Sequence, residues 1–557
     1  MGKIKTNKNS LPIDMDKAKL SLIFFRCLPY LTVVILAIIA VSHILLTPWV
    51  NIYLYNGDSL TLPLLAKSIV AGEDFRWHFS SQLFFFPEGI LYGLCYAITP
   101  SISWSLIANS FLNIILFHAL LFCIAKSIGF HSLKSMFFAI TGTAFIVLFI
   151  ALEPYPDVNR TALVSLSLFN AYYFGVILSS LLLLVLTILI IQRIDSLNTL
   201  LSSRNLLLLI AVVGITSLTY CSNPLLVLQF SLPFLASILV MLFLKWLHAP
   251  AFKALLFSQI VGLLLGQGLR FFFIENIGRP INRYINITSI YKVSKSFFEN
   301  LLLIKSSYFS LAEYTIIFFI LLFSVFSIFN LASFWRSKKF DVANSKDVAI
   351  TFLLLFAILS PIITVAGTIA SGNFLMRYFL PIAFFPLLSL IFLFYHWPQL
   401  IPRNKVCYAI YLFCMPVLIF LISKAVWPGQ EKTVLLSEPI DCYTRHMEQL
   451  SFNVVGGFWT SRQLDLYGTT GSRALQVNNE LEPFLWLNNA APYAQLKLNG
   501  VIVDKSTGGI KIPNHIYAED VAKLGPYSKK FSCNKFDIYY YADGSEGFLL
   551  LNAFVKK

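Results

Sequence analysis

The sequence predicts an all-α polytopic membrane bundle of about 11 transmembrane helices, with a small C-terminal extracytoplasmic α+β domain. The chain of 557 residues is 57% hydrophobic and 12% charged, which is more apolar surface than a soluble core can bury. Apolar segments of about 20 residues, enough to cross a hydrocarbon layer of about 30 Å, recur along residues 21–425. From residue 426 onward they give way to short alternating segments and turn residues.

Three regions follow from these patterns. Residues 1–20 form a basic cytoplasmic leader, residues 21–425 the bundle, and residues 426–557 the C-terminal domain. Two long outside loops, at about residues 48–100 and 275–310, interrupt the bundle. The span centres that we predict are Ile35, Ile114, Phe145, Leu183, Val212, Ala236, Leu263, Phe319, Phe356, Pro386 and Phe413.

The distribution of basic residues predicts the orientation. With a cytoplasmic N-terminus, Lys126, Arg193, Lys245, Arg336 and Arg403 all fall in inside loops, as the positive-inside rule requires. An odd number of crossings then places the first long loop and the C-terminal domain on the same outer face. The first apolar run lacks a small-residue cleavage pattern, so we expect it to remain as an anchor.

Composition and motifs narrow the function. The net charge of +15 is spread over inside loops and the tail, so membrane lipid is the expected partner and nucleic acid is not. The sequence has no Walker loop, no dinucleotide-binding glycine motif, no His-Glu-x-x-His zinc motif and no nucleophile elbow. ATP-driven and soluble-cofactor chemistries are therefore disfavoured, and we expect no cofactor.

The C-terminal domain has recognisable local signals. Asn499-Gly500 predicts a hairpin turn between alternating apolar residues, residues 517–524 predict a short helix ended by Gly525-Pro526, and residues 536–541 predict a strand. Cys442 and Cys533 lie in this exported segment, where a disulfide would close a loop of about 90 residues and stabilise the fold by about 4 kcal/mol. Two buried thiols are the alternative.

Asp58 is the first candidate for catalysis. It lies in the first outside loop, and a positioned carboxylate there can accept the proton of a sugar hydroxyl as a glycosidic bond forms. It also precedes an amphipathic stretch, residues 59–71, that ends at Gly72, so a helix N-cap explains it equally well. Both interpretations stay open.

Other polar residues of the outside loops are substrate-binding candidates. Glu73 and Asp74 offer an alternative base or a metal site, although an adjacent acidic pair on a loop is more often simply solvated. Asp157 and Arg160 form a third short polar loop, for which an ion pair that tethers the loop is the simpler explanation.

Basic residues on the outer side suit a phosphate. The second long loop carries Arg279, Arg283 and Lys292 where the topology rule expects few cations, and guanidinium or ammonium groups there can stabilise a departing phosphate. A solvated loop or binding of lipid headgroups is the alternative. Arg377 lies at the outer end of a span, where a charge is a functional hypothesis tempered by snorkelling.

The layout resembles the C-type superfamily of membrane glycosyltransferases, which use lipid-phosphate sugars on the non-cytoplasmic face. The resemblance rests on Asp58 in the first outside loop, the aromatic segment Phe84-Phe85-Phe86-Pro87-Glu88-Gly89, and Arg377-Tyr378 followed by Pro386. It implies that Asp58 is the base, that the basic outside residues bind the donor phosphate, and that Tyr378 belongs to the site. Many members have two adjacent acidic residues where this chain has Gly57-Asp58-Ser59, which leaves the base assignment and metal dependence open.

These observations together predict an inverting hexosyltransferase of the bacterial inner membrane, with a periplasmic C-terminal domain. We expect a polyprenyl-phosphate-linked sugar as donor and an extracytoplasmic glycan such as lipopolysaccharide O-antigen as acceptor. The alternatives are a polysaccharide polymerase, a lipid-linked oligosaccharide flippase and a non-catalytic assembly scaffold. A flippase should carry its charges in a central cavity, whereas here they gather at one face.

Overall fold

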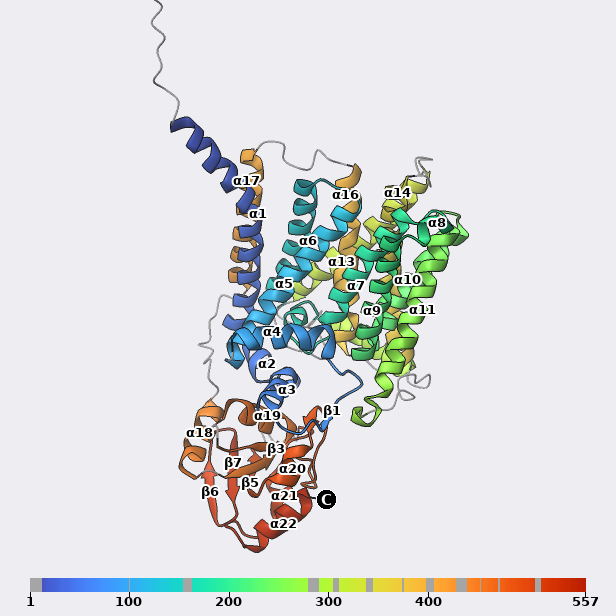
Figure 1. The fold of residues 1–557 in the computed structure, drawn as a ribbon. Coiled ribbons are helices and arrows are strands. Elements are labelled where there is room, and N and C mark those ends of the chain that lie inside the picture. The colour runs from blue at the N-terminus through green and yellow to red at the C-terminus, as the bar shows by residue number, and fades with distance from the viewer. Residues whose placement is uncertain are drawn as a thin grey trace, which may run out of the picture.

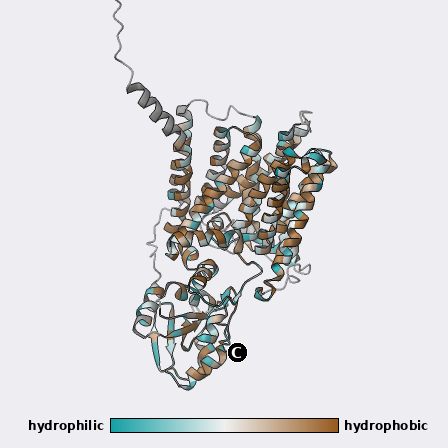
Figure 2. Ribbon diagram, viewed as in Figure 1, coloured by the Kyte–Doolittle hydropathy of each residue, from teal (hydrophilic) through white to brown (hydrophobic). Residues whose placement is uncertain are grey.

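The computed structural model describes residues 13–99, 101–153, 163–278, 290–303, 310–336, 344–372, 375–396, 405–426, 438–450, 452–468, 471–505 and 512–556. A bundle of long helices stands on a smaller domain formed by the C-terminal part of the chain (Figure 1). The bundle helices are predominantly hydrophobic, whereas the smaller domain mixes hydrophobic and hydrophilic residues (Figure 2). The protein is therefore a multi-pass membrane protein with a small α+β domain at one end of its bundle.

Long helices make up most of the bundle. They are α1 (Ile13–Leu46), α5 (Ile102–Ser127), α6 (Ser132–Leu152), α7 (Phe174–Arg193), α9 (Ser203–Ser222), α11 (Ala249–Phe271), α13 (Ser310–Arg336), α14 (Ser345–Ser371) and α17 (Lys405–Val426). The shorter elements among them are η2 (Ser165–Leu168), α8 (Leu197–Leu200), η3 (Val227–Ser231), α10 (Leu232–Phe243), η8 (Met376–Phe379), α15 (Leu380–Phe384), η9 (Phe385–Ser389) and α16 (Leu390–His396).

Nine helical segments of the described residues are long and apolar enough to cross a membrane. Of the other two predicted centres, Ala236 lies on the shorter apolar segment Val227–Phe243, and Phe413 lies on α17, an apolar helix of 22 residues. Helix α1 begins at Ile13, so the segment that we predicted as a cytoplasmic leader already contains helix. The span Met376–His396 is interrupted, because Pro381 and Pro386 begin new helical segments within it.

Side-chain size decides which helices approach most closely. Helices α9 and α11 pack along most of their length, and the α11 face toward α9 carries Gly262 and Gly266. A Cβ on Gly262 would lie 2.7 Å from the Cβ of Thr216, and one on Gly266 would lie 2.6 Å from the carbonyl oxygen of Ser217. Small residues four apart therefore allow backbone contact in an environment where lipid offers no hydrophobic driving force.

The first long loop folds into short elements at the end of the bundle that faces the C-terminal domain (Figure 1). They are α2 (Trp49–Tyr55), α3 (Thr61–Val70), β1 (Trp77–His78), η1 (Phe85–Gly89) and α4 (Ile90–Ile98). Past α11, the second loop contributes η4 (Ile274–Asn276) and α12 (Ile290–Leu303). The predicted stop at Gly72 is confirmed, because Gly72 adopts a φ of 68° directly after α3.

The N-cap interpretation of Asp58 is wrong. Helix α3 begins at Thr61 and its N-cap is Leu60, which makes no side-chain cap hydrogen bond. Asp58 instead lies in a turn three residues earlier, where its backbone carbonyl accepts a hydrogen bond from the Thr61 hydroxyl at 2.8 Å. Its carboxylate is therefore not used to cap the helix.

The C-terminal domain is built on a five-stranded mixed sheet with strand order β3-β2-β5-β7-β6. The strands are β2 (Asn453–Gly456), β3 (Ala474–Gln476), β5 (Leu498–Asp504), β6 (Lys529–Ser532) and β7 (Phe536–Tyr540), and β4 (Asn488–Asn489) lies outside this sheet. The helices are α18 (Glu438–Leu450), α19 (Phe458–Tyr467), α20 (Ala491–Gln495), α21 (Ala518–Val521), η11 (Ala522–Leu524) and α22 (Glu546–Val555). The predicted strand at 536–541 and the helix at 517–524, ended by Gly525 with a φ of 74°, are confirmed.

The predicted hairpin at Asn499-Gly500 is wrong, because both residues lie inside the single strand β5. Gly500 pairs with Val454 on one side and Tyr540 on the other. A Cβ at this position would lie 2.8 Å from the Phe452 ring and 2.9 Å from Val454 Cγ1. The glycine is therefore needed for close approach of strands and not for a turn.

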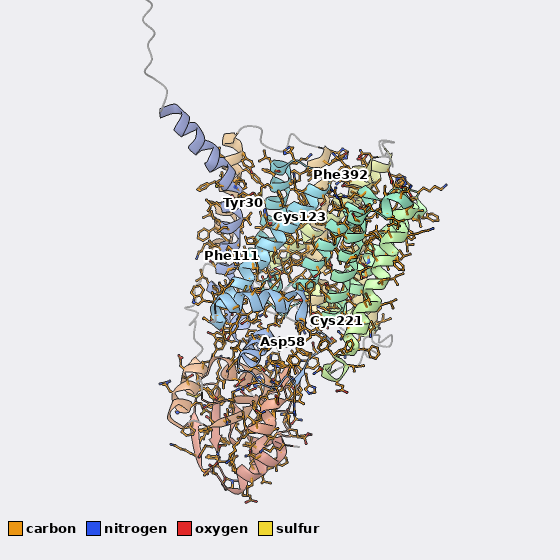
Figure 3. All side chains as sticks on the ribbon, viewed as in Figure 1. Tyr30, Asp58, Phe111, Cys123, Cys221 and Phe392 are labelled. Carbon is orange, nitrogen blue, oxygen red and sulfur yellow. A yellow bond between two sulfur atoms is a disulfide. The ribbon has the colours of Figure 1, made fainter. Side chains whose placement is uncertain are left out.

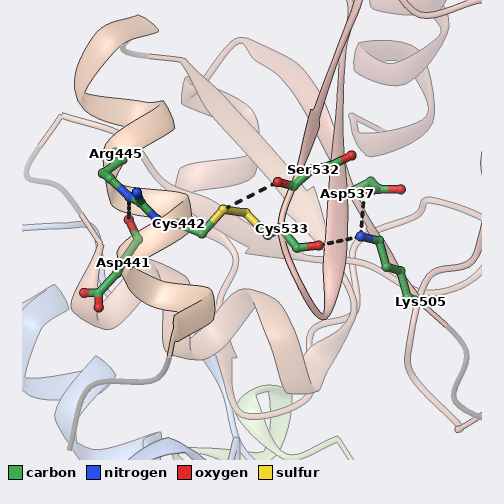
Figure 4. The surroundings of a disulfide bond; sticks show 7 residues. All are labelled: Asp441, Cys442, Arg445, Lys505, Ser532, Cys533 and Asp537. Atoms are coloured by element: carbon green, nitrogen blue, oxygen red, sulfur yellow. Dashed lines mark hydrogen bonds and ion pairs between the residues drawn. A yellow bond between two sulfur atoms is a disulfide. The ribbon is translucent and has the colours of Figure 1, made fainter. Parts of the chain in front are cut away.

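Cys442 and Cys533 form a disulfide that joins α18 to the segment between β6 and β7 (Figure 4). The Cα atoms lie 5.9 Å apart, and the two residues are separated by 91 positions in the chain. Lys505 forms an ion pair with Asp537 nearby, with an N–O distance of 3.1 Å (Figure 4). The cross-link therefore ties the beginning of the domain to its last two strands.

Candidate functional site

The first long loop and the C-terminal domain share backbone hydrogen bonds. Strand β1 pairs antiparallel with β4, so Trp77 faces Asn489 and His78 faces Asn488. Asp58 lies at this junction, between the helical bundle and the C-terminal domain (Figure 3). The two outer parts that the topology argument placed on one face are therefore in direct contact.

A cavity of about 120 Å³ opens at the junction. Its walls come from five separate stretches of the chain, and the residues that line it are Asp58, Thr61, Ser80, Ser81, Gln82, Phe84, Ala171, Tyr173, Leu375, Arg377, Tyr378, Trp486 and Leu487. Bundle, outer loop and C-terminal domain each contribute to it. The lining combines one carboxylate, one guanidinium, hydroxyl and amide groups, and aromatic rings, as is typical of ligand sites.

Asp58 and Arg377 meet across the cavity. Arg377 Nη1 donates a hydrogen bond to Asp58 Oδ2 at 3.2 Å, and the side chains are 24% and 20% exposed for Asp58 and Arg377 respectively. The guanidinium carbon of Arg377 lies 5.5 Å from the ring centre of Tyr172 and 5.3 Å from that of Tyr173. The cation is thus held by an ion pair and two aromatic faces while both charges remain accessible.

The turn that carries Asp58 is fixed by local hydrogen bonds. The backbone N–H of Asp58 donates to Asn56 Oδ1 at 3.0 Å, and its carbonyl accepts from Thr61 as described above. Asn56 Oδ1 also accepts a longer hydrogen bond, of 3.4 Å, from the Tyr172 hydroxyl. The carboxylate therefore projects from a turn whose backbone is already satisfied.

The wall formed by residues 80–84 is held from the ends of α9 and α11 that face the C-terminal domain. Arg270, only 2% exposed, donates to the carbonyl of Cys221 at 3.0 Å and to that of Ser81. The N–H of Leu83 donates to the carbonyl of Ser222 at 2.8 Å. Arg270 escaped the sequence analysis, although a lone arginine at the outer end of an otherwise uncharged stretch was an available signal.

Tyr378 lines the cavity beside Arg377. Its carbonyl accepts a hydrogen bond from Gln229 Nε2 at 3.0 Å, and its ring lies 5.8 Å from that of Tyr173. Gln229 belongs to the π-helical η3 and is fully buried in the bundle. A polar side chain of the bundle interior therefore fixes the backbone next to Arg377.

Glu73 and Asp74 do not line the cavity. Glu73 pairs with Arg473 of the C-terminal domain and accepts hydrogen bonds from Ser68 at 2.6 Å and Asn489 at 3.1 Å. Asp74 is exposed, and its backbone carbonyl accepts from Asn489 at 3.0 Å. The two acidic residues lie where the outer loop is joined to the C-terminal domain.

Arg473 bridges Glu73 to a second carboxylate, that of Asp465, at 2.6 Å. Burial alone would raise the pKa of Asp465, but the charges of Arg473 and Lys67 lower it below its ordinary value. Burial lowers the pKa of Lys67, whose ammonium group donates to the carbonyl of Asp465. This charged cluster joins α3 to α19 and acts as a tether between the two parts of the protein.

The remaining site candidates lie elsewhere. Lys292 is exposed on α12 and does not line the cavity. Four other candidates, Asp157, Arg160, Arg279 and Arg283, lie outside the described residues.

Metal-binding geometry occurs at one place in the described part of the chain. Ligand atoms of Cys442, His446 and Cys533 lie within 4.8 Å of one another. The two sulfurs are bonded to each other, so they offer no thiolate in this state. At the cavity, Asp58 is the one carboxylate among the lining residues.

No model of a known protein family and no curated protein matches this chain.

Proposed function

We propose that this protein is an inverting glycosyltransferase that moves a sugar from a polyprenyl-phosphate donor to an extracytoplasmic glycan such as lipopolysaccharide O-antigen. The observation that carries this proposal is the Asp58 carboxylate beside the Arg377 guanidinium in a polar cavity. That cavity lies between the outer loop of a membrane bundle and a water-facing domain. A lipid-borne donor and a soluble acceptor can both reach such a place.

The two charged residues suit the two halves of a single displacement. The acceptor hydroxyl attacks the anomeric carbon, the bond from that carbon to the phosphate oxygen breaks, and Asp58 takes the hydroxyl proton. Arg377 stabilises the negative charge that develops on the departing phosphate oxygen. A guanidinium has five N–H donors, so a hydrogen bond to Asp58 leaves donors for a phosphate.

Helix direction and basic residues support an extracytoplasmic cavity in a bacterial inner membrane. Helix α7 begins next to Tyr173, which lines the cavity, and ends at Arg193. Helix α5 carries Lys126 in its last turn. Helix α11 carries Lys253 near its start and Arg270 in its last turn, where Arg270 binds the cavity wall at Ser81. The helix ends that carry Lys126, Arg193 and Lys253 lie opposite the cavity (Figure 1), and the positive-inside rule assigns these ends to the cytoplasm. The C-terminal domain is then periplasmic.

The contribution of the C-terminal domain to the cavity supports a water-borne acceptor. Trp486 and Leu487 line the cavity from this domain, whereas Arg377 and Tyr378 come from the end of a bundle segment. Trp486 is half-buried and gives the acceptor side a flat, partly apolar face. The donor phosphate then approaches from the bundle and the acceptor glycan from the domain.

The test compares surface polysaccharides by mass spectrometry with and without the chain. Transfer predicts the loss of one hexose per repeat when the chain is deleted, whereas loss of all polymer would favour a polymerase or a flippase. Asp58→Asn should lower transfer by about 100- to 10,000-fold at equal protein levels in the membrane. Asp74→Asn is the matched control, because Asp74 is an exposed acidic residue of the same loop and should leave transfer unchanged. Normal modification by the Asp58 variant would remove Asp58 from the reaction.

A further inference from the structure

One arginine of the C-terminal domain lies inside the junction and binds both parts of the protein. Arg462 belongs to α19 and is 2% exposed. Its Nε donates to the carbonyl of Gly57 at 2.9 Å, and its Nη2 donates to the Thr61 hydroxyl at 3.1 Å. Its Nη1 donates to Gln476 Oε1 at 3.2 Å and to the carbonyl of Leu487 at 2.5 Å. One guanidinium thus joins four acceptors from three separate stretches of the chain.

Three of these acceptors belong to residues next to Asp58 or on the same cavity. Gly57 directly precedes it, and the Thr61 hydroxyl donates to its backbone carbonyl at 2.8 Å. Thr61 and Leu487 line the same cavity as Asp58. Arg462 therefore fixes the turn of Asp58 on both sides, and it sets the position of the cavity wall from the C-terminal domain relative to that turn.

The aromatic ring beneath Arg462 touches the same turn. The guanidinium carbon lies 5.0 Å from the ring centre of Phe458, the first residue of α19. A Cβ on Gly57 would lie 2.6 Å from Cε1 of that ring. Glycine at position 57 therefore lets helix α19 pack directly against the turn that carries Asp58.

An arginine is a costly choice for this position if stability is its only role. All four of its bonded acceptors are neutral oxygens, and burying a cation without a bonded carboxylate carries a large desolvation penalty. Burial lowers the pKa of Arg462 to about 10, while the charge of Asp58 acts in the opposite direction, so the guanidinium stays protonated at neutral pH. Its planar fork can hold several acceptors in one fixed geometry, which the point charge of a lysine cannot do.

We propose that Arg462 is a positioning residue for Asp58, so that the C-terminal domain completes the transfer site and is not merely a separate binding module. This inference rests on the proposed function for the role of Asp58. Whether Arg462 holds the turn at residues 56–62 in place can be measured without knowing the reaction.

The first experiment measures amide hydrogen exchange in the purified full-length protein. Arg462→Gln removes the fork and should raise the exchange rate of peptides covering residues 56–62 by about tenfold or more, while the strands of the C-terminal sheet stay protected. Arg473→Gln is the matched control, because it removes another guanidinium of the same junction, the half-buried one that binds Glu73 and Asp465. It should leave exchange at residues 56–62 unchanged. Arg462→Lys keeps the charge without the fork and should resemble Arg462→Gln.

The second experiment measures sugar transfer in a double-mutant cycle. If Arg462 acts through Asp58, Arg462→Gln should lower transfer in the protein that keeps Asp58. In the Asp58→Asn background the same substitution should lower the residual transfer no further. A merely structural role would give the same fold loss in both backgrounds.

The two readouts separate the inference from the proposed function. Three results would overturn the inference whatever the transfer assay shows. They are an unchanged exchange rate at residues 56–62 in Arg462→Gln, an equally raised exchange rate there in Arg473→Gln, and a normal exchange rate there in Arg462→Lys. Increased exchange together with normal transfer by Asp58→Asn would instead overturn the proposed function. Should Arg462→Gln fail to accumulate, the comparison of Arg462→Lys with Arg473→Gln decides the same question.

Discussion

Arg377 Nη1 donates a hydrogen bond of 3.2 Å to Asp58 Oδ2, although 319 positions separate the two residues in the chain. The pair forms where the outer end of an interrupted bundle span meets the first long loop. Both side chains line the cavity, whereas Glu73 and Arg473, which form the tether, do not.

The ion pair predicts the effect of changing Arg377. Arg377→Gln should lower transfer by about 100- to 1,000-fold, because it removes both the partner of Asp58 and the charge facing the leaving phosphate. Arg377→Lys should restore only part of this loss, since an ammonium group lacks the planar fork. The measurement is the rate of glycan modification at equal membrane levels, with the KM for a polyprenyl-phosphate sugar. Unimpaired transfer by the glutamine variant would rule out this role.

Glu88 predicts a pH dependence of stability. It is buried in η1, outside the nine candidate spans, and neither of its carboxylate oxygens has a hydrogen-bond partner among the described residues. Burial raises its pKa from 4.5 to about 8. Below pH 4.5 the Glu88 carboxyl is protonated in both the folded and the unfolded protein. Between pH 4.5 and about 8 it ionises in the unfolded protein but stays protonated in the folded one, so the free energy of unfolding falls as the pH rises.

The size of this effect and its test follow from the same shift. At about 1.4 kcal/mol per pKa unit, the loss of stability between these two pH values is on the order of 3 to 5 kcal/mol. Thermal unfolding in detergent should show a midpoint that decreases from pH 5 to pH 8. Glu88→Gln should flatten this dependence, and an equally steep slope in that variant would contradict the assignment.

The disulfide predicts a difference between cysteines. Cys442→Ser or Cys533→Ser should destabilise the C-terminal domain by about 4 kcal/mol, because the bond closes a long loop of the unfolded chain. Cys414→Ser should have no such effect, since Cys414 is free and exposed. Thermal unfolding with and without reductant measures the effect, and peptide mapping without reduction should recover the linked pair. A free thiol at both positions in the native protein would refute it.

Gly500 predicts a cost for any side chain in strand β5. Gly500→Ala should destabilise the domain by about 1 to 3 kcal/mol, because the new Cβ meets the Phe452 ring and Val454. Gly471→Ala is the control, since a Cβ there would meet no atom within 4 Å. The measurement is the thermal midpoint of each variant. An unaltered midpoint for Gly500→Ala would show that β2 and β5 can move apart without loss.

Local patterns accounted for much of the fold. Gly72 and Gly525 end their helices as predicted, since each adopts a positive φ that glycine tolerates. The same kind of argument was wrong at Gly500 and at Asp58. A glycine needed for strand contact has the same local sequence as a turn glycine, and a helix start shifted by two or three residues changes which side chain caps it.

The site itself was predictable only in part. Asp58, Arg377 and Tyr378 were named from the sequence, the first two because polar groups beside an apolar span stand out and Tyr378 through the family resemblance, and all three line the cavity. Glu73 was named as a substrate-binding candidate, but its partner Arg473 lies 400 positions away in the chain, so the sequence did not reveal their ion pair. Arg270 and Arg462 were missed because their acceptors are neutral oxygens, mostly backbone carbonyls, which no sequence pattern marks as partners of an arginine.

By itself, the sequence determined that this chain builds a membrane bundle with a small C-terminal α+β domain, and it marked the polar groups that flank the apolar spans. Apolar length and residue periodicity are properties of short segments, and lipid leaves the backbone few alternatives to a helix. Only the tertiary structure decided which of those polar groups share a cavity. Hydrogen bonds such as that of Arg462 to Gly57, 405 positions apart, form because packing brings two surfaces together, and no local pattern records that contact.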